Sequence, residues 1–213
     1  MDITTAQKLS YGVYVVSAWH DGKAAGCIAN AVMQVTADPP TLAVSINRDN
    51  YTNECIKGTG KFAVSILAED CDPSVIGTFG FKSGRTVDKF ASVKSLVEAN
   101  MPVLADSCGY LVCDLKDAME TSTHTVFLGE ITDCAKLGDR KPMTYDYYHN
   151  VIKGKSPKTA PTYVEEAAAP EQKRVRKFRC KLCGYVYEGE SLPPDIACPI
   201  CGVGADEFEE MAG

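Results

Sequence analysis

Two Cys-x-x-Cys pairs in the last part of the sequence constrain its folding more than any other feature. The pairs are Cys180 with Cys183 and Cys198 with Cys201, and 14 residues separate them. A turn at each pair directs two thiolates to a common centre, and two such turns complete a tetrahedral site for iron or zinc. Two disulfides are the alternative, which the lack of secretory features in the sequence disfavours. The sequence therefore predicts one metal ion bound by four cysteines.

The segment that carries these cysteines is too small to fold by hydrophobic burial alone. From Phe178 onward it has about 36 residues, fewer than the roughly 40 that domains without staples usually need. A structural tetrathiolate can contribute about 10–16 kcal/mol to folding. We therefore expect loss of the metal to unfold this segment.

The composition predicts a soluble protein of the cytoplasm. No apolar run approaches the roughly 18 residues of a membrane span, and the first eight residues do not resemble a secretory signal. The formal net charge of -6 argues against nucleic acid as a partner. Six further cysteines without paired spacing are expected to be mostly buried thiols of a reducing compartment: Cys27, Cys55, Cys71, Cys108, Cys113 and Cys134.

A change in composition near residue 156 divides the chain. Residues 156–175 contain three prolines and four alanines but few large apolar side chains, which is typical of an exposed tether. The predicted domains are a body over residues 1–163, a linker over 164–175 and a small domain over 176–213.

Hydrophobic periodicity in the body is mostly that of strands. Strands are expected at residues 11–19, from the turn at 20–22 through 30, and at 32–36, 41–46, 62–67, 111–115 and 123–133. Helices are expected at 54–57, capped by Asn50 or Thr52 and closed by Gly58, and at 73–79. Six or more short strands with a few helices indicate a mainly β fold with α, a closed or half-open barrel.

Three polar segments of the body could bind a ligand. Residues 26–36 place small and hydrogen-bonding side chains within a strand, which suits a flat ligand or simply a polar sheet face. Ser83, Gly84 and Arg85 offer a hydroxyl, flexible N–H groups and a guanidinium for a phosphate, although such a triplet is often only a loop. His124 at a strand start is as compatible with a surface histidine as with a functional one.

In this order, the segments resemble the flavin reductase-like, FMN-binding split-barrel family. The resemblance covers residues 1 to about 163 and rests on residues 26–40, 45–52, 79–90 and 123–130. Residues 143–149 and 160–163 resemble the end of the flavoredoxin-like members. The family implies a Greek-key split β-barrel, a homodimer and one FMN per subunit near the dimer interface.

The resemblance assigns roles to individual residues. It places Asn30, Ala31 and Gln34 at the isoalloxazine edge and ribityl chain, Asn47, Asn50 and Thr52 along the ribityl and phosphate end, and Ser83, Gly84 and Arg85 at the phosphate. His124 is implied to lie near the reactive flavin face, where a nicotinamide stacks. Gln34 and His124 depart from the pattern of many members. Arg85 is the first choice as the phosphate cation, with Arg48 and Lys89 as alternatives.

The C-terminal segment resembles a rubredoxin centre of the short type found in rubrerythrins. The resemblance rests on residues 178–189, 197–202 and 206–208. It favours iron over zinc, which the spacing alone cannot distinguish. A one-electron iron site also complements a flavin, which accepts a hydride and can release electrons singly.

The two parts in this order resemble the family of high-molecular-weight rubredoxins of anaerobes. That family implies electron transfer from NADH or NADPH through FMN to iron, and then to a flavodiiron-type terminal reductase of nitric oxide, oxygen or peroxide. One alternative is a flavin reductase that releases reduced FMN and carries a structural zinc ribbon. Another is a non-enzymatic flavin or zinc adaptor. Because no Rossmann-type Gly-x-Gly-x-x-Gly segment is present, nicotinamide binding would have to use the flavin face.

Overall fold

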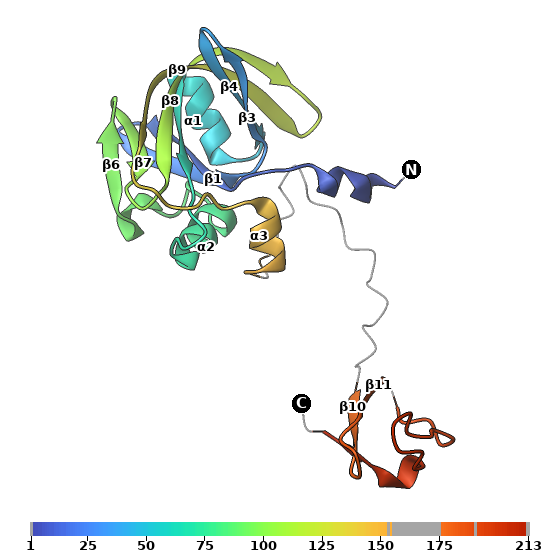
Figure 1. The fold of residues 1–213 in the computed structure, drawn as a ribbon. Coiled ribbons are helices and arrows are strands. Elements are labelled where there is room, and N and C mark those ends of the chain that lie inside the picture. The colour runs from blue at the N-terminus through green and yellow to red at the C-terminus, as the bar shows by residue number, and fades with distance from the viewer. Residues whose placement is uncertain (1, 153, 155–175, 190, 212–213) are drawn as a thin grey trace. The chain divides into compact units, whose positions relative to one another are not determined.

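The computed structural model describes residues 2–152, 154, 176–189 and 191–211. The chain forms two compact units, residues 1–164 and 165–213 (Figure 1). The predicted linker, residues 164–175, and the segment 160–163 lie outside the described residues. Within the described part, no helix is long and apolar enough to cross a membrane.

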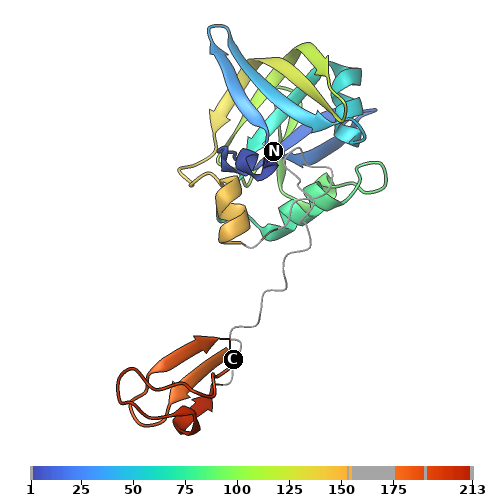
Figure 2. The same cartoon turned by 90° about the vertical axis from the view of Figure 1, so that its right-hand side faces the viewer.

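The first unit is built mainly from strands (Figures 1 and 2). Its strands are β1 (Tyr14–His20), β2 (Lys23–Ala29), β3 (Val32–Ala37), β4 (Pro40–Asn47), β5 (Lys61–Ile66), β6 (Ser95–Glu98), β7 (Met101–Leu104), β8 (Gly109–Glu120) and β9 (His124–Lys136). Its helices are α1 (Tyr51–Thr59), α2 (Pro73–Phe81) and α3 (Tyr145–Asn150), with 3₁₀ turns η1 (Ile3–Lys8) and η2 (Phe90–Ser92).

Seven of these strands form one antiparallel sheet that curls into a split barrel. Their order is β2-β1-β5-β8-β9-β4-β3, so β2 and β3 lie at opposite edges of the sheet. Only Asn30 and Ala31 separate these two strands in the sequence. A connection of two residues cannot span a flat sheet of seven strands, which would be roughly 28 Å wide. The two edges must therefore approach each other at Asn30 and Ala31, where the barrel closes without a hydrogen-bonded ladder.

The β1–β2 connection confirms the turn expected at residues 20–22. Asp21 and Gly22 both have positive φ values, 47° and 75°, as a two-residue type I′ hairpin requires. The hairpin of β6 and β7 was not predicted. It has a turn of the same kind at Ala99 and Asn100, and the Asn100 carbonyl accepts a hydrogen bond from Trp19 Nε1 at 2.6 Å.

Helix α1 is longer than the sequence pattern indicated. Asn50 caps it, since its side chain accepts a hydrogen bond from the Thr52 N–H at 3.0 Å. The expected end at Gly58 is wrong: the helix continues to Thr59 and is capped by Gly60, which adopts a left-handed φ of 67° and donates to the Ile56 carbonyl. Ile56 is fully buried in the barrel core, so α1 packs against the sheet.

Two apolar clusters stabilise the body. The barrel interior contains Val16, Val44, Val64 and Phe127, none of which is exposed. The second cluster lies between the sheet and helices α2 and α3, and includes Val15 and Phe79. The sheet thus has one face in the barrel core and part of the other covered by helices.

The second unit is a three-stranded sheet with a small core. Its strands β10 (Arg176–Cys180), β11 (Val186–Gly189) and β12 (Phe208–Glu210) have the order β11-β10-β12, and η3 (Ala205–Glu207) precedes β12. Phe178 and Phe208 are the buried aromatic residues of its core, together with Cys180 and Cys198. Two aromatic rings and two thiols are a small core, which is consistent with a role for metal in its stability.

Candidate flavin site and metal centre

The four predicted metal ligands are brought together in the second unit. Sγ of Cys180 lies 3.7 Å from Sγ of Cys201, and Sγ of Cys183 lies 3.5 Å from Sγ of Cys198. All four sulfur atoms lie within 4.8 Å of one another. Metal–sulfur bonds of about 2.3 Å place the corners of a tetrahedron about 3.8 Å apart. The sulfur atoms therefore fit one tetrahedral metal ion and are too far apart for disulfides.

The two turns that carry these cysteines are built alike. Gly184 donates to the Cys180 carbonyl at 2.9 Å, and Gly202 donates to the Cys198 carbonyl at 2.8 Å. Both glycines have left-handed φ values, 79° and 76°, a conformation that carries little strain only for glycine. This repetition explains why two short sequence motifs suffice to form a symmetric site.

The chain stabilises the anionic form of two of the thiols. The N–H groups of Cys183 and Leu182 lower the pKa of the Cys180 thiol. Burial raises the pKa of the Cys198 thiol, but the N–H groups of Cys201 and Ile200 outweigh it, and the pKa falls to about 6. Burial raises the pKa of Cys201 to about 12, and the pKa of Cys183 is raised as well. Because thiolate is the form that binds iron or zinc, a metal would have to displace protons from these two thiols.

One side of the metal centre faces solvent. Cys180 and Cys198 are buried, whereas Cys183 is exposed and Cys201 is partly exposed. The apolar side chains Leu182 and Ile200, one from each turn, are also largely exposed. The second cysteine of each pair is therefore the one that an electron-transfer partner could approach.

In the body, Asn50 and Thr52 lie beside the strand predicted to bind the flavin. Thr52 is buried, and both side chains interact with the thiol of Cys27 on β2. Burial raises the pKa of Cys27, and the Thr52 hydroxyl, the Lys89 ammonium and Asn50 oppose this effect. The start of α1 therefore packs against β2 at Cys27.

The loop of Ser83, Gly84 and Arg85 packs on the same end of α1. The Arg85 guanidinium carbon lies 4.9 Å from the centre of the Tyr51 ring, and its Nη2 donates to Glu54 Oε2 at 2.6 Å. A Cβ atom on Gly84 would lie 3.0 Å from Tyr51 Cδ1, so glycine permits this close approach. Arg85 therefore contacts the first turn of α1, which Asn50 caps and to which Thr52 belongs.

Lys89, the first alternative cation for the phosphate, is buried and donates its hydrogen bonds to backbone carbonyls of the body. It is 3% exposed, and its Nζ donates to the carbonyls of Gly26 at 2.8 Å and Phe79 at 3.2 Å. Burial lowers its pKa, and the Cys27 thiol opposes this. Lys89 therefore joins α2 to β2, and its ammonium is less available to a ligand than the half-exposed guanidinium of Arg85.

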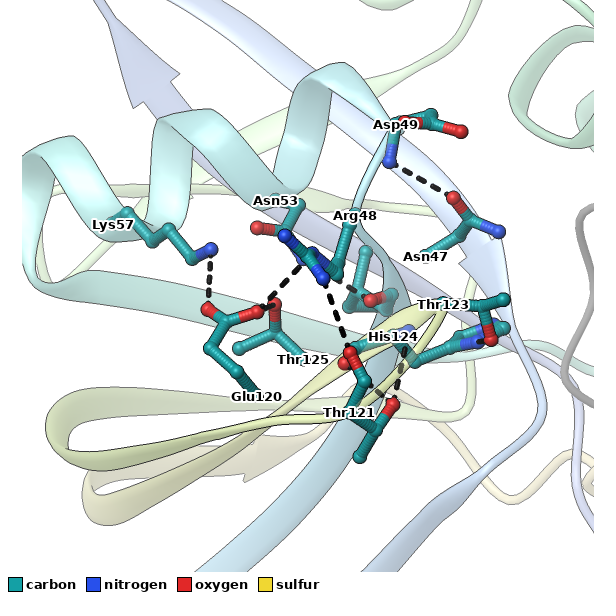
Figure 3. Close-up of polar contacts among 11 residues, drawn as sticks. Asn47, Arg48, Asp49, Asn53, Lys57, Glu120, Thr121, Thr123, His124 and Thr125 are labelled. Atoms are coloured by element: carbon teal, nitrogen blue, oxygen red, sulfur yellow. Dashed lines mark hydrogen bonds and ion pairs between the residues drawn. The ribbon is translucent and has the colours of Figure 1, made fainter.

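Arg48, the other alternative cation, forms a hydrogen bond and an ion pair with the turn between β8 and β9 (Figure 3). Its N–H donates to the Thr123 carbonyl at 2.9 Å, and its Nη1 donates to the Thr121 carbonyl at 3.2 Å. Its Nε lies 3.4 Å from Glu120, whose other carboxylate oxygen lies 2.6 Å from Lys57 Nζ on α1. Arg48 thus holds this turn against the loop that precedes α1.

The contacts of Arg48 with this turn position His124 next to the β4–α1 loop. His124 is the register partner of Asn47 at the end of the β4–β9 ladder, and its Nδ1 lies 2.8 Å from the Thr123 hydroxyl. The Asn47 carbonyl accepts from the Asn50 N–H at 3.1 Å, and its side chain accepts from the Asp49 N–H. The loop of residues 47–50 therefore connects His124 to the start of α1.

The remaining predicted residues lie at the barrel seam and on β3. Asn30 is buried, and the Ala31 carbonyl accepts a hydrogen bond from the Ser45 N–H at 3.0 Å. Gln34 is exposed, pairs with Leu42, and donates to the Thr36 carbonyl. Because Leu42 is five positions from Asn47 on β4, Gln34 lies roughly 17 Å along the ladder from that group. Within one subunit the structure does not bring Gln34 to the start of α1.

Comparison with protein families identifies both units. A model described as "Flavin reductase like domain" matches residues 6–154. The chain belongs to the flavin reductase-like family. A second model, "Rubrerythrin, rubredoxin-like domain", matches residues 178–209. The flavin reductase-like domain therefore corresponds to the barrel, and the rubredoxin-like domain contains the four-cysteine site.

Relatives share either the whole arrangement or the barrel alone. The chain is 42% identical to the high molecular weight rubredoxin of Moorella thermoacetica, over 99% of this chain and all of that protein. It is 36% identical to the ferric-chelate reductase (NAD(P)H) of Archaeoglobus fulgidus, over 78% of this chain and 99% of that protein. The crystal structure of flavoredoxin from Methanosarcina acetivorans matches with a TM-score of 0.57 and 27% identity, over 62% of this chain and 74% of that one.

These findings confirm the predicted two-part architecture and the oxidoreductase class. The residues at the start of α1 fit a phosphorylated flavin, because they combine buried polar side chains, a loop permitted by glycine, and a guanidinium. Sequence analysis missed Tyr51 and Glu54, which contact Arg85, and the role of Glu120. The sequence signal for Tyr51 was its position directly after the helix cap Asn50.

Proposed function

We propose that the protein transfers electrons from NADH or NADPH, through FMN, to an iron ion held by Cys180, Cys183, Cys198 and Cys201. Its acceptor would be a terminal reductase of the flavodiiron type that consumes nitric oxide, oxygen or a peroxide. The observation that carries the proposal is the presence of a flavin reductase-like domain and a tetrathiolate centre on one polypeptide. The relative named a high molecular weight rubredoxin has the same arrangement over its full length.

The residues of the body would bind and orient the flavin. Arg85, with the Ser83 hydroxyl and the N–H groups around Gly84, would hold the phosphate beside Asn50 and Thr52. Asn30 and Ala31 at the seam would contact the ring edge, and His124 would border the face where a nicotinamide stacks. When bound, FMN accepts a hydride and passes its electrons on singly.

The four cysteines would hold the iron with one side open to partners. Iron in such a site carries one electron at a time. The exposed Cys183 and Cys201, with Leu182 and Ile200 beside them, would form the surface through which an electron enters and leaves. The sequence predicts a tether over residues 164–175, and a flexible chain of that length has a root-mean-square reach of about 17–21 Å. This reach would keep the rubredoxin-like domain close to the flavin at an effective concentration on the order of millimolar.

A homodimer would complete the site. Edge strand β3 leaves Met33 64% and Val35 46% exposed, and apolar side chains on an edge strand favour burial against another chain. Gln34 lies between them in the sequence but projects from the opposite face of β3, so its side chain would meet a second subunit only where that subunit also covers the edge of the strand. Sedimentation of the flavin-loaded protein should give twice the mass of the chain, and a monomer would contradict this part of the proposal.

An anaerobic absorbance titration tests the electron path. The purified protein should show overlapping flavin and ferric-thiolate bands, and NADH or NADPH should bleach both. Bleaching of the flavin alone, with zinc in the protein, would instead indicate a flavin reductase with a structural ribbon. If neither nicotinamide bleaches either band, the chain is not a nicotinamide oxidoreductase.

A shortened linker tests the transfer between domains. Deletion of residues 166–172 should slow iron reduction while flavin reduction keeps its rate. A matched control replaces the same residues with a Gly/Ser stretch of equal length, which should preserve both rates. Equal iron reduction in the deletion variant would argue against a shuttling domain.

A further inference from the structure

A half-exposed ion pair lies at the predicted phosphate end of the flavin site. Arg85 and Glu54 form it, with side chains 52% and 50% exposed. Glu54 follows Tyr51 by three residues, so both project from one face of the first turn of α1. Because the guanidinium lies over the Tyr51 ring, Arg85 lies across this turn and Glu54 is its carboxylate partner.

Glu54 accepts a hydrogen bond from Nη2 of Arg85, a donor that a phosphate would also use. The N–H fork of arginine binds carboxylates and phosphates with the same geometry. The hydrogen bond from Arg85 keeps the pKa of Glu54 below its ordinary value, so the carboxylate is charged at neutral pH. A phosphate that binds Nη2 of Arg85 must therefore displace Glu54 from this nitrogen, and it then lies near the negative charge of Glu54.

The Arg85–Glu54 ion pair is weak enough for a phosphate to replace Glu54 at the guanidinium. Exposed pairs contribute little to stability, whereas a charge-assisted contact between guanidinium and phosphate is strong. The exchange needs only a rotation of the Glu54 side chain, since the stack on Tyr51 can hold the guanidinium in place. The pair can therefore open without a change in the backbone of α1.

We propose that Glu54 is an internal competitor for the flavin phosphate, which weakens the binding of FMN but not that of riboflavin. The proposal rests on the proposed function, because it requires the phosphate to bind at Arg85. It adds a residue that sets how strongly the site prefers phosphorylated flavins.

Flavin titrations of Glu54→Gln test the proposal. We expect FMN to bind about two- to fivefold more tightly, with riboflavin affinity unchanged, as measured by quenching of flavin fluorescence. The matched control Glu130→Gln removes another exposed carboxylate of the body, the partner of Lys116, and should leave both affinities unchanged. An unchanged or lower preference for FMN in Glu54→Gln would overturn the proposal, as would an equal gain in Glu130→Gln.

A double-mutant cycle separates competition for Arg85 from simple repulsion. In the Arg85→Gln background, Glu54→Gln should no longer increase FMN affinity. A gain as large as in the native background would show that Glu54 acts without Arg85, which would also overturn the proposal.

Arg85→Gln alone distinguishes failure of this inference from failure of the site. It should bring the affinity for FMN close to that for riboflavin. If the preference for FMN persists in Arg85→Gln, the phosphate does not bind at Arg85, and the proposed site and the inference both fail. If the preference is lost but Glu54→Gln has no effect, only the competition is wrong.

Discussion

Asn47 and His124 face each other as the last residue pair of the β4–β9 ladder. Directly opposed residues of an antiparallel pair project from the same face of the sheet. Asn47 begins the loop that leads to Asn50, the cap of α1. His124 follows the β8–β9 turn, to which Arg48 is hydrogen-bonded. One ladder position therefore joins the predicted flavin contacts to the predicted nicotinamide face.

This arrangement predicts separate effects on binding and on reduction. His124→Ala should slow reduction of the bound flavin by NADH or NADPH at least ~10-fold, because the nicotinamide would lose an orienting contact. Flavin affinity, measured by quenching of flavin fluorescence, should change by less than about twofold, whereas stopped-flow bleaching under anaerobic conditions measures the rate of reduction. His149→Ala, a histidine of α3, serves as the control. Equal reduction rates in the native and His124→Ala proteins would remove His124 from the mechanism.

Close packing around Gly129 in the barrel predicts that a larger residue there lowers the stability of the body. A Cβ atom on Gly129 would lie 2.7 Å from both the Phe62 ring and Cys113 Cβ, and both of those residues are fully buried. Gly129→Ala should therefore lower the free energy of unfolding by about 1–3 kcal/mol. Urea unfolding followed by the fluorescence of Trp19, the one tryptophan of the chain, measures the change.

The matched control is a glycine with open space around it. Gly77 lies inside α2, and a Cβ atom there would meet nothing within 4 Å. Gly77→Ala should stabilise the body by about 0.5–1 kcal/mol, because alanine favours the helix more than glycine does. Loss of stability in Gly77→Ala similar to that in Gly129→Ala would contradict the steric explanation.

The local pattern of the sequence predicted most barrel strands and the cap of α1. Asn50 was predictable because a side chain that caps a helix acts on residues two positions away. The contact between Arg48 and Thr121 was not, since the two residues are 73 positions apart and no spacing rule joins them. The Gly58 boundary was wrong because the glycine that adopts the left-handed conformation and ends α1 is Gly60, two residues further along the chain.

The β6–β7 hairpin and the Arg85–Glu54 pair escaped prediction for different reasons. Leu96 and Val97 are partly or largely exposed, so the hairpin lacks the alternation of a half-buried strand. Residues 83–85 were identified as a phosphate loop from their chemistry, but which helix they contact depends on the tertiary fold. Long-range contacts therefore determine which of several polar segments share a site.

Arg140 predicts how stability depends on pH. It pairs with Asp70 at 2.8 Å and with Asp106, and its hydrogen bond lowers the pKa of Asp70. A carboxylate whose folded pKa is lowered stabilises the fold above its unfolded value, about pH 4, and this stabilisation is lost as pH falls through the folded pKa. The native protein should therefore exceed Arg140→Met in stability at pH 7, and the difference should shrink below pH 4.

Urea unfolding at pH 7, 4.5 and 3.5 measures this difference. Lys116→Met removes a more exposed cation that has a single carboxylate partner, Glu130, and serves as the control, with a smaller loss at pH 7. A difference between the native protein and Arg140→Met that stays constant over this range would show that Arg140 acts through packing and not through charge.

Removal of the metal should unfold the rubredoxin-like domain and leave the barrel intact. The core of that domain is small, whereas a structural tetrathiolate can contribute about 10–16 kcal/mol. A strong chelator under reducing conditions should make residues 176–211 sensitive to protease while the unfolding midpoint reported by Trp19 stays the same. Cys183→Ser should lower the metal content, whereas Cys134→Ser, an exposed cysteine outside the site, should not. Protease resistance of the domain after complete metal loss would mean that its two phenylalanines and loops suffice to fold it.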